Sequence, residues 1–499
     1  YSSNNFAFKP LCQEVVVALP MALFATVGFA VFTAVGSDLV GPRDPEHSSS
    51  AFVHLFEWSW ADVAAECEQW LGPKGFTGVQ ISPPNEHMAG DPWWTRYQPV
   101  TYRLISRSGD ELAFIDMVQR CRAVGVGIYA DAVINHVAAG NGTSIAGSSY
   151  GGRSTPIFSP SDMHHFESDT SGNCFVSNYS NKWNVQYCDL LGLPDLCTAC
   201  SHVQNTVAGF LNHMGEIGVA GFRFDAAQHQ DAGELAQLLS KVEPHLWKFG
   251  EVTESTDPQD MHAVTPSMYT SIMDVTDFGY GSFVGQHVKV SEVGKLMSDF
   301  SWPSMMSGEN AVVFVDNHDT QRGGAALTHR NQTLYQLATV FMLAHPFGFP
   351  KVMSSYYYET YDQGPPSVPV HNNGDLQCGD GKPWVCEHRW TPVANMVSWR
   401  RSAGGANISV LHFDPQSGDS SVAFCRGVSA CVAFNQQTAS WTLTFQVPLI
   451  DGHYCDVMQS DDPWSCPTVV VAGGIVALEV PSESVVAFHV GRMRVVETV

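Results

Sequence analysis

The chain has few basic residues for its length. Lysine and arginine total 25 against 49 aspartates and glutamates, so the 499 residues carry a formal net charge of −24 at pH 7. A protein that binds nucleic acid is expected to present a basic surface, and this balance argues against that class. The acidic excess favours solubility and carries no information about the fold.

Long apolar runs are also lacking, except in residues 15–36, VVVALPMALFATVGFAVFTAVG. Lys9 precedes this run, and Ala34-Val35-Gly36 resembles a small-residue cleavage site. Residues 1–36 are therefore predicted to be a secretory signal peptide, which predicts a secreted, extracellular protein. The alternative is a membrane anchor, since the run is just long enough to span a bilayer.

Cysteine is not scarce, and thirteen cysteines in an exported protein predict disulfides. Cys12 lies in the predicted signal, which leaves twelve. A zinc site at Cys197-Thr-Ala-Cys200 is disfavoured, because no second Cys or His pair follows at zinc-finger spacing.

After Ser50, short apolar strands alternate with amphipathic helical segments. This order favours a parallel sheet, and eight units favour a closed (β/α)₈ TIM barrel over 51–134 and 196–405. Helices are predicted at 61–71, 113–124, 203–215 and 333–343. The strands are predicted at 51–56, 79–82, 127–134, 222–225, 247–251, 269–274, 312–316 and 352–355.

Two further regions break this α/β pattern. Residues 135–195, after the third strand, are rich in Gly, Ser and Asn and are predicted to form a small inserted domain, since so long a loop in a compact domain is usually functional or a domain of its own. Residues 406–499 alternate like half-buried strands and are predicted to form an all-β Greek-key sandwich.

Carboxylates stand at three of the predicted strand ends: Asp225, Glu251 and, just beyond the seventh strand, Asp319. Active sites of such barrels lie at the carboxyl ends of the strands, so these groups are expected to converge. Each alone could be a helix cap or an ion-pair partner, and Arg223 could simply pair with Asp225. Two carboxylates flanking a scissile bond are what glycosyl transfer requires.

Aromatic residues follow the second strand in the segment 93–98, WWTRYQ. Exposed aromatic side chains in a barrel loop suit stacking on sugar rings, and the alternative is packing within the loop. Asn135 and His136 end the third strand, where the inserted domain begins.

Taken together, these stretches resemble the α-amylases of glycoside hydrolase family 13. The chain is most similar to the chloride-dependent, animal-type branch, which also has marine bacterial members, and the match covers about residues 51–499. The motifs are HLFEWSW (54–60), GVQISPPNEH (78–87), WWTRYQPVTY (93–102), DAVINH (131–136), GVAGFRFDAAQH (218–229), FGEV (249–252), FVDNHDTQRG (314–323), KVMSSY (351–356) and WVCEHRW (384–390).

The resemblance implies endo-hydrolysis of α-1,4-glucosidic bonds in starch, glycogen and malto-oligosaccharides, with retention of configuration. Asp225 matches the nucleophile, Glu251 the general acid/base, whose pKa should be raised, and Asp319 the third carboxylate. The residues implied in substrate binding are Trp93, Trp94, Tyr97, Gln98, His136, Arg223, Gln228, His229 and His318. A monomer with no nucleic-acid partner is expected.

The resemblance also implies two ions and a set of disulfides. Arg223, Asn317 and Lys351 match a chloride site, where chloride is an allosteric activator; many relatives carry Arg in place of Lys351. Asn135, Asp195, His229 and a backbone carbonyl near Gln186 match a structural calcium site. The implied disulfides are Cys67–Cys121, Cys174–Cys188, Cys378–Cys386, Cys425–Cys431 and Cys455–Cys466, while the pairing of Cys197 with Cys200 stays open.

Some positions depart from the family pattern. Gln228 stands where relatives usually have Lys, and the loop after Arg322 is shortened to Gly-Gly-Ala-Ala. Two other functions stay open: an exo-acting or transglycosylating relative, and a non-catalytic barrel that binds carbohydrate or serves a transporter. Non-catalytic barrels typically lose one of the three carboxylates, and all three are present here.

Overall fold

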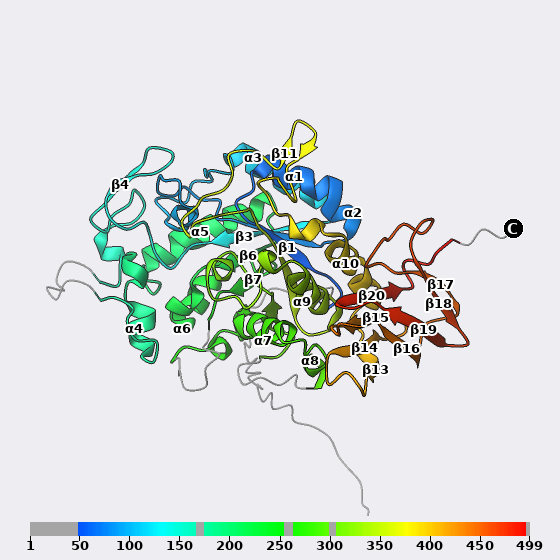
Figure 1. Ribbon diagram of the computed structural model, residues 1–499. Helices are drawn as coiled ribbons and strands as arrows, with labels where there is room; N and C mark the ends of the chain where they lie inside the picture. Colours follow the sequence, from blue (N-terminus) through cyan, green and yellow to red (C-terminus); the bar gives the residue numbers. More distant parts are fainter. Residues whose placement is uncertain (1–47, 166–173, 254–262, 299–305, 496–499) are drawn as a thin grey trace, which may run out of the picture. The chain divides into compact units, whose positions relative to one another are not determined.

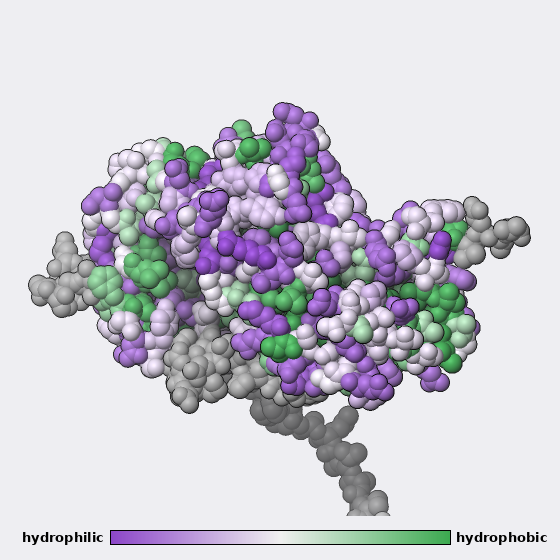
Figure 2. All heavy atoms as spheres, in the orientation of Figure 1, coloured by the Kyte–Doolittle hydropathy of each residue, from purple (hydrophilic) through white to green (hydrophobic). Residues whose placement is uncertain are grey.

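The computed structural model describes residues 48–165, 174–253, 263–298 and 306–495. The predicted signal peptide or anchor, residues 1–36, lies outside them. Among the described residues, no helix is both long and apolar enough to cross a bilayer. Hydrophilic residues cover much of the face shown in Figure 2, in keeping with the acidic composition.

Eight parallel strands close into a barrel in the order β1-β10-β9-β8-β7-β6-β3-β2, which confirms the predicted (β/α)₈ class. Figure 1 shows helices gathered around these strands. The strands are β1 (Phe52–Leu55), β2 (Gly78–Ile81), β3 (Gly127–Ala132), β6 (Gly221–Phe224), β7 (Trp247–Gly250), β8 (Asp274–Asp277), β9 (Ala311–Val313) and β10 (Phe349–Ser354).

The helices of this unit pack their apolar faces on the strands, as the helical spacing of apolar residues predicts. They are α1 (Trp60–Glu66), a π-helical turn (Cys67–Leu71), α2 (Gly72–Lys74), α3 (Glu111–Ala123), α5 (Ser201–Ile217), α6 (Ala232–Leu239), α7 (Phe278–Lys289), α8 (Lys295–Ser298), α9 (Thr333–Ala344) and α10 (Thr391–Ala403). The predicted helix 61–71 is thus divided at Cys67, where the π turn begins.

The sixth strand is the main error of the sequence prediction. It was expected at 269–274, but β8 begins only at Asp274, where it pairs with Phe249. The apolar residues before it form turns, and buried Tyr269 donates its hydroxyl to the carbonyl of Gln230 at 2.7 Å. An apolar run buried by loop packing has the same composition as a buried strand, so local sequence does not separate the two.

The floor of the barrel is aromatic. Phe52, Tyr129, Trp247, Phe249, Val312 and Phe349 form one buried cluster. The Tyr129 ring occupies the space above Gly78, where an added Cβ would lie 2.3 Å from a ring carbon. Glycine at this strand position is therefore required by the bulk of its neighbour.

Inserted between β3 and α5 is an irregular segment with little regular structure, as predicted. It contains β4 (Gly142–Thr143), β5 (Ser149–Tyr150) and the short helix α4 (Lys182–Tyr187). Val137 N–H donates to Pro194 O at 3.1 Å, so the two ends of the insertion are held together at the barrel mouth.

The C-terminal region forms two antiparallel four-stranded sheets, β13-β14-β15-β20 and β16-β19-β18-β17. In the second sheet the fourth strand returns beside the first, which is the predicted Greek-key order. Phe341 of α9 lies 5.8 Å from the Phe434 ring, so the first sheet also packs on the barrel. The strands are β13 (Ile408–Phe413), β14 (Ser421–Arg426), β15 (Ala430–Asn435), β16 (Trp441–Gln446), β17 (Gly452–Cys455), β18 (Thr468–Ala472), β19 (Ile475–Val480) and β20 (Ser484–His489), and a separate hairpin joins β11 (His371–Asn372) to β12 (Asp375–Leu376).

Disulfides join the five pairs implied by the resemblance and also join Cys197 to Cys200. Four of them close loops within the barrel and the C-terminal region, and two lie at the inserted segment. A closed loop lowers the entropy of the unfolded chain and so favours the folded one.

Candidate active site

One guanidinium lies among three carboxylates at the carboxyl end of the barrel. Arg223 Nη1 is 2.7 Å from Asp225 Oδ1 and 2.8 Å from Asp131 Oδ1, and Nη2 is 2.9 Å from Glu251 Oε2. The resemblance interprets Arg223 as a chloride ligand rather than as the partner of Asp225; in the structure it is paired with Asp225 as well. Three buried carboxylates this close together need the Arg223 guanidinium between them, because an unpaired buried charge is costly.

Local backbone geometry couples the ends of β6 and β7. Ala226, directly after Asp225, adopts the left-handed region with φ 48°. This turn aims the Ala226 N–H at Glu251 Oε2, 2.9 Å away, and Gln228 N–H donates to Glu251 O at 3.1 Å. A left-handed non-glycine residue costs about 1–2 kcal/mol, and such strain is usually found at functional sites.

A cleft of about 520 Å³ opens above this cluster. Arg223 does not line it, because the guanidinium lies beneath Asp225 and Glu251 and is only 2% exposed. All other residues implied in catalysis and sugar binding line the cleft: Trp93, Trp94, Tyr97, Gln98, His136, Asp225, Gln228, His229, Glu251, His318 and Asp319.

Part of the cleft wall was missed by the sequence reasoning. Tyr179, Leu190, Leu191 and Leu193 come from the inserted segment, and Tyr361 comes from the loop after β10. Leu191 is 90% exposed and left-handed. In the sequence, Leu191 is only an apolar residue in an irregular loop, and that does not predict that the loop runs beside the cleft.

The aromatic segment 93–98 was expected either to stack on sugar rings or to pack within its loop, and Trp93 and Tyr97 are placed for both. The Tyr97 ring stacks on His318 with centroids 5.0 Å apart and planes at 12°, while Trp93 meets His318 edge-on at 5.7 Å. Both side chains are largely buried by this packing and still present an edge to the cleft. The loop is therefore fixed before any sugar binds.

Burial raises the pKa of Asp225 to about 6; Arg223 opposes this shift and Glu251 adds to it. Burial likewise raises the pKa of Asp319 to about 7, with a further rise from Glu251. Burial also raises the pKa of neighbouring Asp131 to about 6. These groups interact, so their protons leave in steps that belong to the cluster.

These shifts predict the acid limb of the pH profile. A nucleophile must be ionised, so kcat/KM is expected to fall as the pH drops below about 6, rather than below the pH of about 4 set by an ordinary aspartate. The measurement is kcat/KM on a soluble malto-oligosaccharide between pH 4 and 8. An acid limb that stays flat down to pH 4.5 would contradict it.

The candidate chloride residues gather two cations in the barrel lumen. Arg223 Nε and both ring nitrogens of His54 are buried without a hydrogen-bond partner in the described structure. Burial and the charge of Arg223 lower the pKa of Lys351 to about 8. Asn317 turns its Oδ1 to the Asp319 and Thr320 N–H groups at 3.0 and 2.8 Å. Two buried cations with an unused donor fit a small anion.

Two of the candidate calcium residues carry side-chain oxygen atoms that no hydrogen bond among the described residues uses. Asn135 Oδ1 and Gln186 Oε1 are buried without a hydrogen-bond partner in the part of the chain that is described. Leu196 N–H donates to Asn135 O at 2.9 Å, which places Asn135 beside the Asp195 segment. His229 Nδ1 lies 2.9 Å from the carbonyl oxygen of Val185, within α4. Oxygen donors of this kind suit Ca²⁺.

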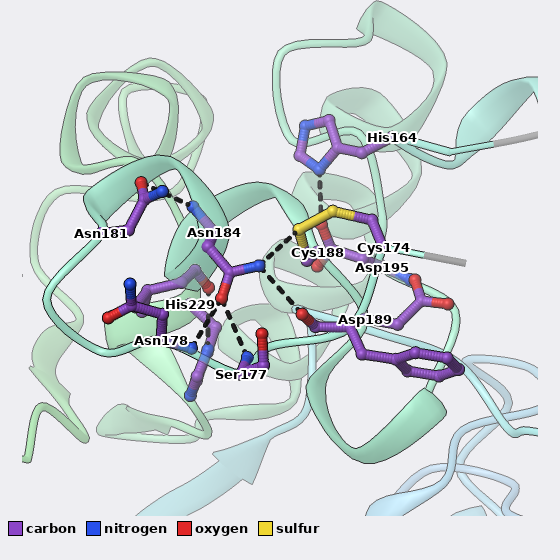
Figure 3. The surroundings of a disulfide bond; sticks show 12 residues. His164, Cys174, Ser177, Asn178, Asn181, Asn184, Cys188, Asp189, Asp195 and His229 are labelled. Carbon is purple, nitrogen blue, oxygen red and sulfur yellow. Dashed lines mark hydrogen bonds and ion pairs between the residues drawn. A yellow bond between two sulfur atoms is a disulfide. The ribbon is translucent and has the colours of Figure 1, made fainter. Parts of the chain in front are cut away.

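Figure 3 shows the Cys174–Cys188 disulfide beside this region, with His164 Nδ1 bonded to Asp195 Oδ2 at 2.6 Å. His165 and the two sulfurs lie within 4.8 Å of one another. Because the sulfurs are bonded to each other, they offer no thiolate to a metal. The oxygen atoms near Asp195 are the better match to a calcium site.

Of the two departures from the family pattern, Gln228 lines the cleft in the described structure and the shortened loop after Arg322 does not. Gln228 lines the cleft, with its Nε2 3.1 Å from His229 Nε2 and its Oε1 accepting from Thr253 N–H at 2.9 Å. The short loop after Arg322 folds back on itself through Ala325 N–H to Thr320 O at 3.1 Å. Residues 323–326 do not line the cleft in the described structure.

A (β/α)₈ barrel with acidic groups at its mouth, beneath a sugar-sized cleft with aromatic edges, defines a barrel glycoside hydrolase. Comparison with known proteins narrows the class. Residues 70–267 match the alpha amylase catalytic domain, and residues 413–491 match the alpha amylase C-terminal all-beta domain.

Relatives match over most of the chain. The alpha-amylase of Streptomyces violaceus is 38% identical over 95% of this chain and 79% of its own length, and that of Tribolium castaneum is 39% identical over 85% and 90%. The crystal structure of a mutant alpha-amylase I of Eisenia fetida with maltohexaose superposes with a TM-score of 0.82 at 34% identity, covering 90% of this chain and 99% of that one. The chain belongs to the α-amylase family.

Proposed function

We propose that this protein is an endo-acting α-amylase that hydrolyses α-1,4-glucosidic bonds in starch, glycogen and malto-oligosaccharides with retention of configuration. The observation that carries the proposal is the shared guanidinium, which holds Asp225 and Glu251 at the floor of one aromatic cleft. The relative from Eisenia fetida, crystallised with maltohexaose, supports a glucan substrate.

Asp225 is assigned the nucleophilic role. Its Oδ1 is held by Arg223, and the other carboxylate oxygen attacks the anomeric carbon while the glycosidic C–O bond breaks. Glu251 gives its proton to the leaving oxygen. Oε2 already accepts hydrogen bonds from Ala226 N–H and Arg223, so that proton is carried on Oε1.

The second step releases the sugar. Glu251, now ionised, takes a proton from water, and the resulting hydroxyl group replaces Asp225 on the anomeric carbon. Two inversions at one carbon give net retention. Asp319, beside His318 at 3.3 Å, is assigned to binding and distorting the reacting sugar. Arg223 holds the carboxylates of Asp225 and Glu251 in place through both steps.

Chloride is proposed to bind near Arg223, Asn317 and Lys351 and to activate the enzyme. Dialysed protein should gain activity when NaCl is added, and Na₂SO₄ at equal ionic strength should not replace it. Lys351→Met should remove the response, whereas Lys351→Arg should keep it, because guanidinium offers a forked donor in place of a point charge. Equal activity with and without chloride would contradict the assignment.

Endo action distinguishes this proposal from its alternatives. Soluble starch should lose iodine colour well before reducing sugar accumulates, and chromatography should show a range of malto-oligosaccharides. A single short product would favour an exo-acting relative, and longer transfer products a transglycosylase. No cleavage at all would favour the non-catalytic barrel. The six disulfides support secretion, and a monomer is expected in size-exclusion chromatography.

A further inference from the structure

We propose that Arg322 is a positioning residue for the reaction: its guanidinium fixes Trp93 and the His318–Asp319 backbone at the cleft. Arg322 ends the short 3₁₀ turn Thr320–Arg322, which follows Asp319. It does not line the cleft, so any effect on the sugar passes through its neighbours. The inference rests on the proposed function of the same site.

Aromatic rings surround the guanidinium. Its central carbon lies 4.3 Å from the Tyr358 ring centre, 5.0 Å from Trp93 and 5.3 Å from Tyr356. Phe56 is a fourth ring, at 5.4 Å. These rings come from the loops after β1, β2 and β10, so one side chain links three strand ends. A partly buried cation over aromatic faces is attracted by each of them.

Hydrogen bonds define its orientation. Arg322 Nη1 donates to His318 O at 2.8 Å, and Nη2 donates to Tyr356 Oη at 2.8 Å. Tyr356 in turn donates to Gln363 O at 2.6 Å, while Trp93 Nε1 donates to Tyr361 O at 2.9 Å. The His318 carbonyl and the Trp93 indole are thus fixed by the same network.

This network places the groups that meet the sugar. His318 stacks on Tyr97, contacts Trp93 and lies 3.3 Å from Asp319 Oδ2. In the described structure Arg322 forms no ion pair, so aromatic rings, one carbonyl and one tyrosine hydroxyl, rather than an acid, surround its charge. Lysine cannot reproduce a planar group that stacks and donates at fixed angles.

Arg330 provides a matched control. Its guanidinium also lies 4.3 Å from the Tyr358 ring centre, and it donates to Tyr358 O. Among the described residues it contacts neither His318 nor Trp93, and it does not line the cleft. Arg330→Lys therefore removes a similar stacking contact from the same ring without disturbing the sugar-facing groups.

The test is steady-state kinetics on an aryl malto-oligosaccharide with wild type, Arg322→Lys and Arg330→Lys, normalised to folded protein. Arg322→Lys should lower kcat roughly 10- to 100-fold with KM within about twofold, because misplaced groups lose their effect chiefly in the transition state. Arg330→Lys should leave both constants within about twofold of wild type. Thermal unfolding of both variants shows whether they fold equally.

If Arg322→Lys does not fold, Arg322→Gln, which keeps a donor for the His318 carbonyl, takes its place. Maltohexaose titration of tryptophan fluorescence, in a Glu251→Gln background, gives a second reading, since a loosened Trp93 should respond less. Equal kcat values for the two lysine variants would overturn the positioning role alone. An inactive wild-type protein would instead refute the proposed function, and the inference with it.

Discussion

Replacing Asp225 with asparagine is expected to lower kcat on starch by about 10⁴-fold or more while the fold is kept. The amide is not a nucleophile, and the remaining catalytic groups cannot substitute for it. Glu251→Gln should have a comparable effect, because the leaving oxygen then receives no proton. Both substitutions keep the size and shape of the side chain above Arg223.

The melting temperature of Asp225→Asn shows whether a loss of activity comes from a loss of fold. Because burial raises the pKa of Asp225 to about 6, ionising it costs stability as the pH rises from about 4 to about 6, and that loss is complete above pH 6. The sign follows from proton counts: between pH 4 and 6 the folded state holds more protons than the unfolded one, so stability falls with pH. At pH 7, Asp225→Asn should therefore not lower the melting temperature.

The matched control is Asp116→Asn on α3, an exposed carboxylate paired with Arg120 at 3.2 Å. It removes the same charge far from the cleft and should change neither kcat nor melting temperature measurably. Starch cleavage retained at more than about one per cent by Asp225→Asn would contradict the assignment of the nucleophile.

Removal of Ca²⁺ is expected to lower the melting temperature by roughly 5 °C or more, because an ion bound only by the folded chain stabilises it by mass action. Asn135, Gln186, Asp195 and His229 are the residues that would hold it. They join the two ends of the inserted segment to the loop after β6, so loss of the ion should loosen the cleft wall that carries Leu191.

The measurement is calorimetry of the full chain with EGTA, followed by re-addition of Ca²⁺ or Mg²⁺. Only Ca²⁺ should restore the melting temperature, since Mg²⁺ demands a tighter octahedral shell. Asn135→Ala should melt at the lower temperature with or without EGTA, while Asp116→Asn should respond as the wild type does. A chelator that leaves the wild-type melting temperature unchanged would contradict the site.

The predictions of β6 and β8 show what a local sequence pattern can and cannot establish. The change from GFRF to polar residues at Asp225 predicted both a strand and its end, and β6 stops at Phe224. Tyr269–Asp274 was equally apolar, yet only Asp274 enters the barrel. What separates the two is whether a neighbouring strand pairs with the backbone, and β7 pairs only from Asp274 onward.

At the active site, the contacts of Arg223 likewise could not be predicted from local sequence. Its spacing from Asp225 predicted that the two side chains share a face, but not how many acids surround the cation. Register places Asp131 of β3 opposite Arg223, and Glu251 follows β7 on the other side. Three carboxylates around one guanidinium make it a structural partner of the catalytic pair as well as a candidate anion ligand.

Local sequence was enough to predict the alternation of strands and helices, the carboxylates at strand ends and the family, because residues close together in the chain carry each of these signals. Tertiary structure decided the rest: the Arg223 cluster, the Tyr179 and Leu191 wall, and the rings around Arg322. These contacts join segments from different parts of the chain, and only closure of the barrel brings them within reach of one another.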